Sequence, residues 1–188
     1  MQSKNTQNRG DLTSQYGFYF DKEKCVGCRA CEVACQIWND SIQTVKWRSV
    51  TCITRGNYPG ITSVNVSLAC MHCGDPLCIK ACPREALSKK EETGTVILDQ
   101  EKCLGCMLCL WACPFGAPRL GIKGKMEKCN FCDERPAGMK RACEEICPTE
   151  AIISGRVNEL SQLAKQNVSE RLFHEKVLGV ILGHENDE

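Results

Sequence analysis

Cysteine dominates this sequence, with 17 of them among 188 residues. Sixteen fall into four groups of four, and only Cys52 lies outside these groups. Within each group the cysteines are only a few residues apart, so several thiols must share one short loop. A chain of this composition either pairs its thiols with one another or binds metal with them. That requirement limits its possible folds more than any hydrophobic pattern does.

The four groups share a form: two cysteines separated by two residues, then a third cysteine, then a fourth after three more residues. The groups are Cys25, Cys28, Cys31 and Cys35; Cys70, Cys73, Cys78 and Cys82; Cys103, Cys106, Cys109 and Cys113; and Cys129, Cys132, Cys143 and Cys147. Proline follows the last three groups, as Pro83, Pro114 and Pro148. This spacing is typical of bacterial ferredoxins, in which three thiolates bind one [4Fe–4S] cluster and the fourth binds its neighbour.

Two other uses of cysteine fit less well. Disulfide frameworks belong to short exported chains, but residues 1–16 lack both the apolar stretch of a secretory signal and a twin-arginine pair. The cysteine count is also odd. Structural zinc usually takes well-separated pairs of ligands. The sequence therefore favours iron–sulfur clusters, and a zinc scaffold stays as an alternative that metal analysis would separate.

Charge and hydropathy exclude several function classes. The net charge is +1, so the sequence offers no basic surface for nucleic acid. No apolar run approaches the roughly 18 residues that a membrane-spanning helix needs. The sequence also contains no glycine-rich nucleotide loop and no acid–base pair apart from the cysteine groups. We therefore expect a non-catalytic protein with no small-molecule substrate of its own.

An internal repeat indicates how the groups are organised. Residues 21–28, DKEKCVGC, match residues 99–106, DQEKCLGC, at an offset of 78. Residues 82–87, CPREAL, match residues 147–152, CPTEAI, at an offset of 65. Short β-prone runs precede the first and third groups. The chain therefore contains two kinds of half-module, each used twice, which predicts two ferredoxin units.

The spacing favours pairing of the second group with the third. Residues 83–102 between them include a hairpin-like stretch around Gly94, which suits the two halves of one compact ferredoxin. The first group then pairs with the fourth, so that one unit is inserted into the other. The rival pairing, first with second and third with fourth, stays open on spacing alone. The predicted class is α+β, with two interleaved bacterial-type 2[4Fe–4S] ferredoxin units.

The favoured pairing predicts the domains. Unit one comprises residues 15–35 and 114–155, and unit two comprises residues 70–113. Residues 36–69 form a β-rich insert, with a strand pair joined by the turn at 56–60, and residues 156–188 form a C-terminal helical extension. A helix is expected to begin at the fourth cysteine of each group. Because the clusters supply folding free energy, the apoprotein is expected to be largely disordered.

The same pairing predicts the cluster ligands, because each fourth cysteine binds the other cluster of its unit. The sets are Cys25, Cys28, Cys31 and Cys147 for cluster one; Cys129, Cys132, Cys143 and Cys35 for cluster two; Cys70, Cys73, Cys78 and Cys113 for cluster three; and Cys103, Cys106, Cys109 and Cys82 for cluster four. Cysteine fills every position, so we expect four [4Fe–4S] clusters.

Several residues near the ligands have simpler explanations. His72 lies inside a ligand loop, where an exposed or hydrogen-bonding role is expected because cysteines already fill the set. Trp111 is expected to pack against cluster four and shield it from water. Lys128 precedes the fourth group, where the charge of an exposed lysine would be screened. Cys52 is expected to be a buried or half-exposed free thiol.

The order of the four groups resembles that of the iron–sulfur electron-transfer subunits of the DMSO reductase-type molybdopterin oxidoreductases. The similarity covers about residues 15–157 and rests on QYGF at 15–18, CMHCGDP at 70–76, CPFGAP at 113–118 and KMEKC at 125–129. It implies a subunit that relays single electrons between a molybdenum or tungsten pterin catalytic subunit and a quinol-linked integral-membrane anchor. It also supports the pairing of the first group with the fourth.

The resemblance further implies an orientation. The cluster of the first group would face the catalytic subunit, and the cluster of the third group would face the anchor. The expected location is the membrane surface, reached through partners, on the periplasmic side if the catalytic partner carries a twin-arginine signal and on the cytoplasmic side otherwise. The alternative function is a polyferredoxin, or the electron-transfer subunit of a hydrogenase or another redox enzyme.

Overall fold

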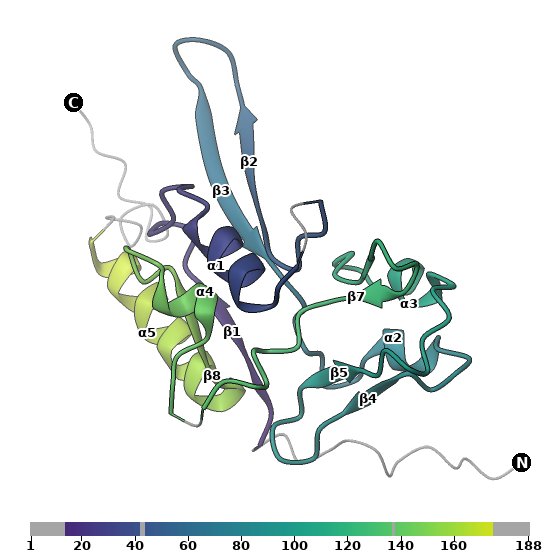
Figure 1. The fold of residues 1–188 in the computed structure, drawn as a ribbon. Coiled ribbons are helices and arrows are strands. Elements are labelled where there is room, and N and C mark those ends of the chain that lie inside the picture. The colour runs from purple at the N-terminus through teal and green to yellow at the C-terminus, as the bar shows by residue number, and fades with distance from the viewer. Residues whose placement is uncertain (1–13, 42–43, 137, 175–188) are drawn as a thin grey trace, which may run out of the picture.

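The computed structural model describes residues 14–41, 44–136 and 138–174, and Figure 1 shows their arrangement. The described strands form four separate two-stranded sheets. Their partners are β1 (Tyr16–Phe20) with β8 (Ile152–Arg156), β2 (Ser49–Arg55) with β3 (Thr62–Leu68), β4 (Leu87–Lys89) with β5 (Val96–Leu98), and β6 (Arg119–Leu120) with β7 (Met126–Glu127). All four pairs are antiparallel. Small sheets combined with short helices agree with the predicted α+β class.

The strand pairs bring distant cysteine groups together. β1 precedes the first group and β8 follows the fourth, and their register sets Phe20 opposite Ile152. β4 follows the second group and β5 precedes the third, with Leu87 opposite Leu98. The β2–β3 hairpin lies between the first and second groups, where the sequence predicts a strand pair, and Figure 1 shows it projecting from the rest of the molecule.

The helices stand in a fixed relation to the cysteines. They are α1 (Ala30–Trp38), α2 (Leu77–Lys80), α3 (Leu108–Trp111), α4 (Ala142–Glu145) and α5 (Val157–His174). The third cysteine of each group is the second residue of α1, α2, α3 or α4. The fourth cysteine lies inside α1 and just beyond the end of the other three. The prediction that it opens a helix is therefore wrong. The first turn, whose N–H groups lack intrahelical partners, instead carries the third cysteine.

The elements form two parts. Figure 1 shows β1, β8, α1, α4 and α5 together, and β4, β5, β7, α2 and α3 together. In the first part α1 packs against α4, and α5 packs against β1 and β8; in the second part α2 packs against α3. The predicted C-terminal helix begins at Val157, and the stretch predicted beyond His174 lies outside the described residues. Among the described residues, no helix has both the length and the apolarity to cross a bilayer.

Cysteine makes up much of the core. Three clusters of buried apolar side chains occur in the described part of the chain, and each contains two cysteines. These are Cys103 and Cys109, Cys31 and Cys143, and Cys70 and Cys129. A two-stranded sheet is marginally stable by itself in water. The stability of the four sheets therefore depends on the group that binds these thiols.

A buried carboxylate joins α1 to the start of β2. Glu32 is 3% exposed and accepts a hydrogen bond from the Val50 backbone N–H. Its Oε2 lies 2.6 Å from Lys46 Nζ. Asp75 and Lys80 form an ion pair of the same length, 2.6 Å, but both of these side chains are largely exposed. The two pairs differ in burial, which allows a matched comparison.

We expect Glu32→Ala to lower the free energy of unfolding of the holoprotein by about 1–3 kcal/mol, because it leaves the buried Val50 N–H without an acceptor. Asp75→Ala should cost at most about 1 kcal/mol, because water screens the exposed pair. Glu32→Gln keeps an acceptor and should recover part of the loss. Urea denaturation followed by circular dichroism, at equal iron content, measures the difference. Equal effects of the two alanine variants would contradict the structural role of Glu32.

Candidate metal centres

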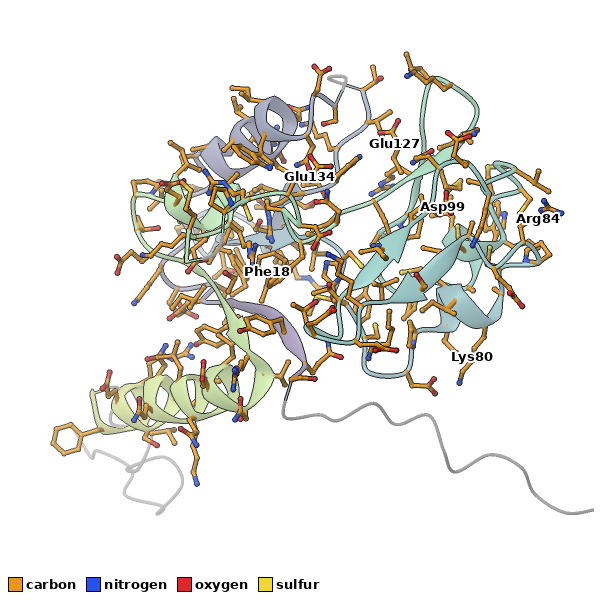
Figure 2. The ribbon with its side chains drawn as sticks, turned by 60° about the horizontal axis from the view of Figure 1, so that its bottom comes forward. Phe18, Lys80, Arg84, Asp99, Glu127 and Glu134 are labelled. Carbon is orange, nitrogen blue, oxygen red and sulfur yellow. The ribbon has the colours of Figure 1, made fainter. Side chains whose placement is uncertain are left out.

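One candidate site is a small cavity in the second part. Its thiols come from Cys82, Cys103, Cys106 and Cys109. Apolar side chains, including those of Leu87, Leu98 and Met126, complete the lining. Figure 2 shows this region, with Arg84, which also lines the cavity, at its outer edge. The cavity therefore brings together the three thiols of the third group and the fourth thiol of the second group.

A second set of thiols lies between α1 and α4. Burial raises the pKa of the Cys35 thiol, and negative charge on Cys129, Cys143 and Cys132 raises it further. Burial also raises the pKa of Cys129 to about 12. Thiols with such high pKa values keep their protons at neutral pH unless a metal replaces them. The fourth cysteine of the first group thus lies near the first three of the fourth group.

Cys31 makes the reverse connection between the same two groups. Burial raises its pKa, and negative charge on Cys143 and Cys147 also raises it. Cys31 Sγ is hydrogen-bonded to Ser67 Oγ at 3.6 Å, and this bond lowers the pKa. The fourth cysteine of the last group therefore influences the thiol of the first group, as an exchange of fourth cysteines requires.

The thiols of the second cysteine group lie near one cysteine of the third group. Burial raises the pKa of Cys78 to about 11, and negative charge on Cys70 and Cys113 is among the causes. Burial likewise raises the pKa of Cys73, with Cys70 and Cys113 again contributing. These three thiols of the second group thus lie near Cys113, the fourth cysteine of the third group.

Backbone N–H groups point at the fourth cysteine in the same way in the second, third and fourth groups. The donor is the alanine four residues later, and the residue before it has a positive φ. The bonds are Ala86 to Cys82 at 3.3 Å, Ala117 to Cys113 at 3.5 Å and Ala151 to Cys147 at 3.3 Å; the φ values are 50° at Glu85, 56° at Gly116 and 51° at Glu150. Sequence reasoning missed these donors, although the shared Cys-Pro-x-x-Ala pattern encodes the turn. Hydrogen bonds to ligand sulfurs tune cluster potentials.

Glycine is required within the first and third loops. Gly27 and Gly105 have φ values of 70° and 71°, the left-handed region that side chains disfavour. A Cβ on Gly105 would lie 1.8 Å from the carbonyl oxygen of Gly124, and one on Gly27 would lie 2.7 Å from Asn65 Oδ1. The Asn65 amide also donates to the carbonyl of Cys25 at 3.3 Å. The β2–β3 hairpin is therefore fitted closely onto the first loop.

These donor sets fit [4Fe–4S] clusters. All 17 cysteines are free thiols, so no disulfide competes for them. The candidate ligands are thiols alone, several accept backbone N–H bonds, and the enclosed cavity has apolar walls. Within residues 14–41, 44–136 and 138–174, no three His, Cys, Asp or Glu side chains are arranged to hold a single metal ion.

An aromatic cluster joins the two parts of the molecule. The Phe131 ring centroid lies 4.8 Å from that of Phe18 and 5.2 Å from that of His72. His72 Nδ1 accepts a hydrogen bond from the Val96 N–H at 3.0 Å, and the Gln15 side chain donates to the His72 carbonyl at 2.8 Å. His72 is 1% exposed, and burial lowers its pKa, so the ring is neutral. The hydrogen-bonding role predicted for His72 agrees with these contacts.

Three other expectations are wrong in whole or in part. Lys128 is buried at 3% exposure and donates to the carbonyls of Val96 and Cys129. Its charge is therefore not screened as that of an exposed lysine would be. Trp111 is 76% exposed and does not shield a cluster, because it is the last residue of α3 and lies on its solvent side. Cys52 is a free thiol, as expected, but it is exposed on β2, so the expectation that it is buried or half-exposed is wrong.

Comparisons with known proteins agree with the thiol chemistry. The family described as "4Fe-4S dicluster domain" matches residues 61–157, and that described as "4Fe-4S binding domain" matches residues 16–36. The B subunit of the anaerobic dimethyl sulfoxide reductase of Escherichia coli is 40% identical over 79% of this protein and 77% of its own length. A thiosulfate reductase electron transfer subunit of Salmonella typhi is 37% identical over 79% of each protein. The formate dehydrogenase iron-sulfur subunit of Wolinella succinogenes is 33% identical over 82% of this protein and 88% of its own length.

We expect His72→Asn to leave the iron content of the anaerobically purified protein unchanged, because His72 supports the loop by hydrogen bonding and is not a ligand. Asparagine tolerates the positive φ of 45° at this position and retains a side-chain acceptor for the Val96 N–H. His72→Ala should lower stability by about 1–3 kcal/mol, because that N–H loses its acceptor. Iron analysis and thermal unfolding measure the two effects. Loss of about four iron atoms in the asparagine variant would identify His72 as a ligand.

Proposed function

The chain belongs to the 4Fe-4S dicluster family of iron–sulfur electron-transfer subunits, and we propose that it connects a molybdopterin catalytic subunit with a membrane anchor through four [4Fe–4S] clusters. It is an electron-transfer subunit of an oxidoreductase complex and not the catalytic subunit. When bound, a [4Fe–4S] cluster accepts and releases single electrons. The protein's own residues hold the clusters, shield them from water and tune them by hydrogen bonds and charge.

The pattern of exposed and buried cysteines is the main observation that supports this proposal. Of the sixteen predicted ligands, all within the described residues, only Cys28 and Cys106 are exposed. Cys28 belongs to the first group and Cys106 to the third, the two groups for which the resemblance implies partner contacts. Exposed apolar side chains lie beside them in sequence, Val26 in one loop and Leu104 in the other. Such surfaces suit protein partners at the two ends of an electron path.

We propose the four ligand sets predicted from spacing. The cavity lined by Cys82, Cys103, Cys106 and Cys109 supports the set of cluster four. The influence of neighbouring thiols on Cys35, Cys31 and Cys78 supports the other three sets. The pairing of β1 with β8 and of β4 with β5 supports two interleaved ferredoxin units. The rival pairing would require strand partners that differ from these.

Contacts of the β6–β7 hairpin favour one adjustment of the proposed boundaries. The Met126 N–H donates to Cys103 Sγ at 3.3 Å, and the Gln100 side chain donates to the Met126 carbonyl at 2.8 Å. Both contacts connect the hairpin to the third cysteine group. We therefore extend unit two to residues 70–127 and begin the second segment of unit one at Lys128.

The proposed partners follow from the relatives. Those relatives are subunits of reductases and dehydrogenases, which supports a catalytic partner for this chain. The resemblance to the molybdopterin oxidoreductases supports a molybdenum or tungsten pterin in that partner and an integral-membrane anchor at the opposite end. The protein would then lie at the membrane surface, on the periplasmic side if the catalytic partner carries a twin-arginine signal and on the cytoplasmic side otherwise.

Anaerobic purification in mild detergent should yield about sixteen iron and sixteen sulfide per chain, together with a large catalytic chain. Metal and sulfide analysis of the complex, with EPR during a reductive titration, measures this. About four zinc per chain without sulfide would contradict electron transfer. A monomer that holds its iron without any stoichiometric partner would favour a free polyferredoxin instead.

Cysteine-to-serine variants separate the two pairings. We expect Cys82→Ser and Cys106→Ser to alter the same EPR signal, because both residues are proposed ligands of cluster four. Cys28→Ser should alter a different signal. Cys52→Ser is the control, since this exposed thiol lies outside all four groups and should change no signal. If Cys82→Ser and Cys28→Ser alter one common signal, the first and second groups are paired instead.

A further inference from the structure

Arg48 is a buried guanidinium with an unusual set of contacts. It is 3% exposed and lies immediately before β2. Its Nη1 donates to Ser67 Oγ at 3.1 Å, and its Cζ lies 4.6 Å from the centre of the Phe18 ring. Its Nη2 is buried without a hydrogen-bond partner among the described residues. Phe18 is half-buried, and Figure 2 labels it near the middle of the view.

A buried guanidinium with an unpaired N–H group requires compensating negative charge. Here that charge comes from cysteines. Ser67 Oγ, which accepts from Arg48, is also hydrogen-bonded to Cys31 Sγ at 3.6 Å. Phe18, against which Arg48 stacks, packs against the apolar cluster that contains Cys31 and Cys143. Burial lowers the pKa of Arg48, but negative charge on Cys143, Cys129, Cys31 and Cys35 more than offsets this and raises it. Arginine therefore stays charged in this position, and the thiolates are the negative groups that it faces.

The four cysteines are unevenly divided between the proposed clusters. Cys35, Cys129 and Cys143 are proposed ligands of cluster two, and Cys31 is a proposed ligand of cluster one. None of the four belongs to the set of cluster four. The charge of Arg48 therefore acts on clusters one and two and not on cluster four. Because the side chain is buried, salt screens its effect only weakly.

We propose that the positive charge of Arg48 raises the reduction potentials of clusters one and two. This inference rests on the proposed function and its ligand sets. Reduction adds one negative charge to a cluster, so a fixed positive charge nearby stabilises the reduced form more than the oxidised form. The unpaired Nη2 adds a donor to the same surroundings, and donors to cluster sulfurs act in the same direction.

Lys128 is the other buried cation in this region, but its bonding differs. Its ammonium group donates to the carbonyls of Val96 and Cys129, so backbone oxygen atoms already occupy two of its N–H groups. Arg48 has one side-chain acceptor and a free N–H group. Arg48 is therefore the cation whose replacement changes the charge near cluster two without removing a backbone contact.

The test compares Arg48→Gln with Arg48→Lys in the anaerobically purified complex. Both variants lose the guanidinium fork, but only lysine keeps the positive charge. We expect Arg48→Gln to lower the equilibrium constant for reduction of cluster one or cluster two about tenfold or more, where tenfold is about 59 mV for a one-electron couple. Arg48→Lys should keep both potentials close to those of the wild type. EPR redox titration measures each potential, with signals assigned through the cysteine variants.

Cluster four provides an internal reference, because its potential should not change in either variant. Unchanged potentials in Arg48→Gln would overturn the inference while leaving the proposed function intact. Equal shifts in both variants would also overturn it, because packing and not charge would then be responsible. If Arg48→Gln loses iron, iron retention by Arg48→Lys supports the need for charge, and loss from both contradicts it. A wild-type protein without iron–sulfur signals would instead contradict the proposed function.

Discussion

The structure depends on the bonding of buried thiols. In the described part of the chain, each of the three apolar clusters contains two buried cysteines, and each of the four sheets has only two strands. Sheets of this size contribute little stability by themselves. Burial also makes the thiolate form costly, as the raised pKa values of Cys35 and Cys129 indicate. Metal bonding relieves both difficulties, because it replaces the proton and cross-links segments that hydrophobic burial alone holds weakly.

Sequence spacing predicted the parts of the fold that local chemistry determines. The four cysteine loops, the β2–β3 strand pair and the start of α5 at Val157 follow from ligand spacing, turn residues and helical periodicity. The ligand sets stay a prediction that the arrangement of thiols supports. Local pattern failed for the fourth cysteine, because the short helix forms around the third cysteine and the chain then turns to place the fourth.

The burial of the charged residues was not predictable from spacing. Arg48 is enclosed by Phe18 and Ser67, and Lys128 donates to Val96, which is far away in the sequence. Basic residues are normally exposed, so composition predicts the opposite for both. Trp111 shows the converse, since a large aromatic residue between two ligands is open to solvent. The burial of Arg48 and Lys128 depends on how the two parts of the molecule meet around Phe131, which only the tertiary structure shows.

The antiparallel pairing of β1 with β8 has a consequence for biosynthesis. Synthesis proceeds from the N-terminus and is slow compared with the formation of a hairpin. β4 and β5 leave the ribosome close together and can pair at once, whereas β1 has to wait until Ile152–Arg156 has been translated. The first cysteine loop therefore emerges early but acquires its strand partner last. The inner part of the chain can therefore fold early, whereas the outer part closes only after β8 has been synthesised.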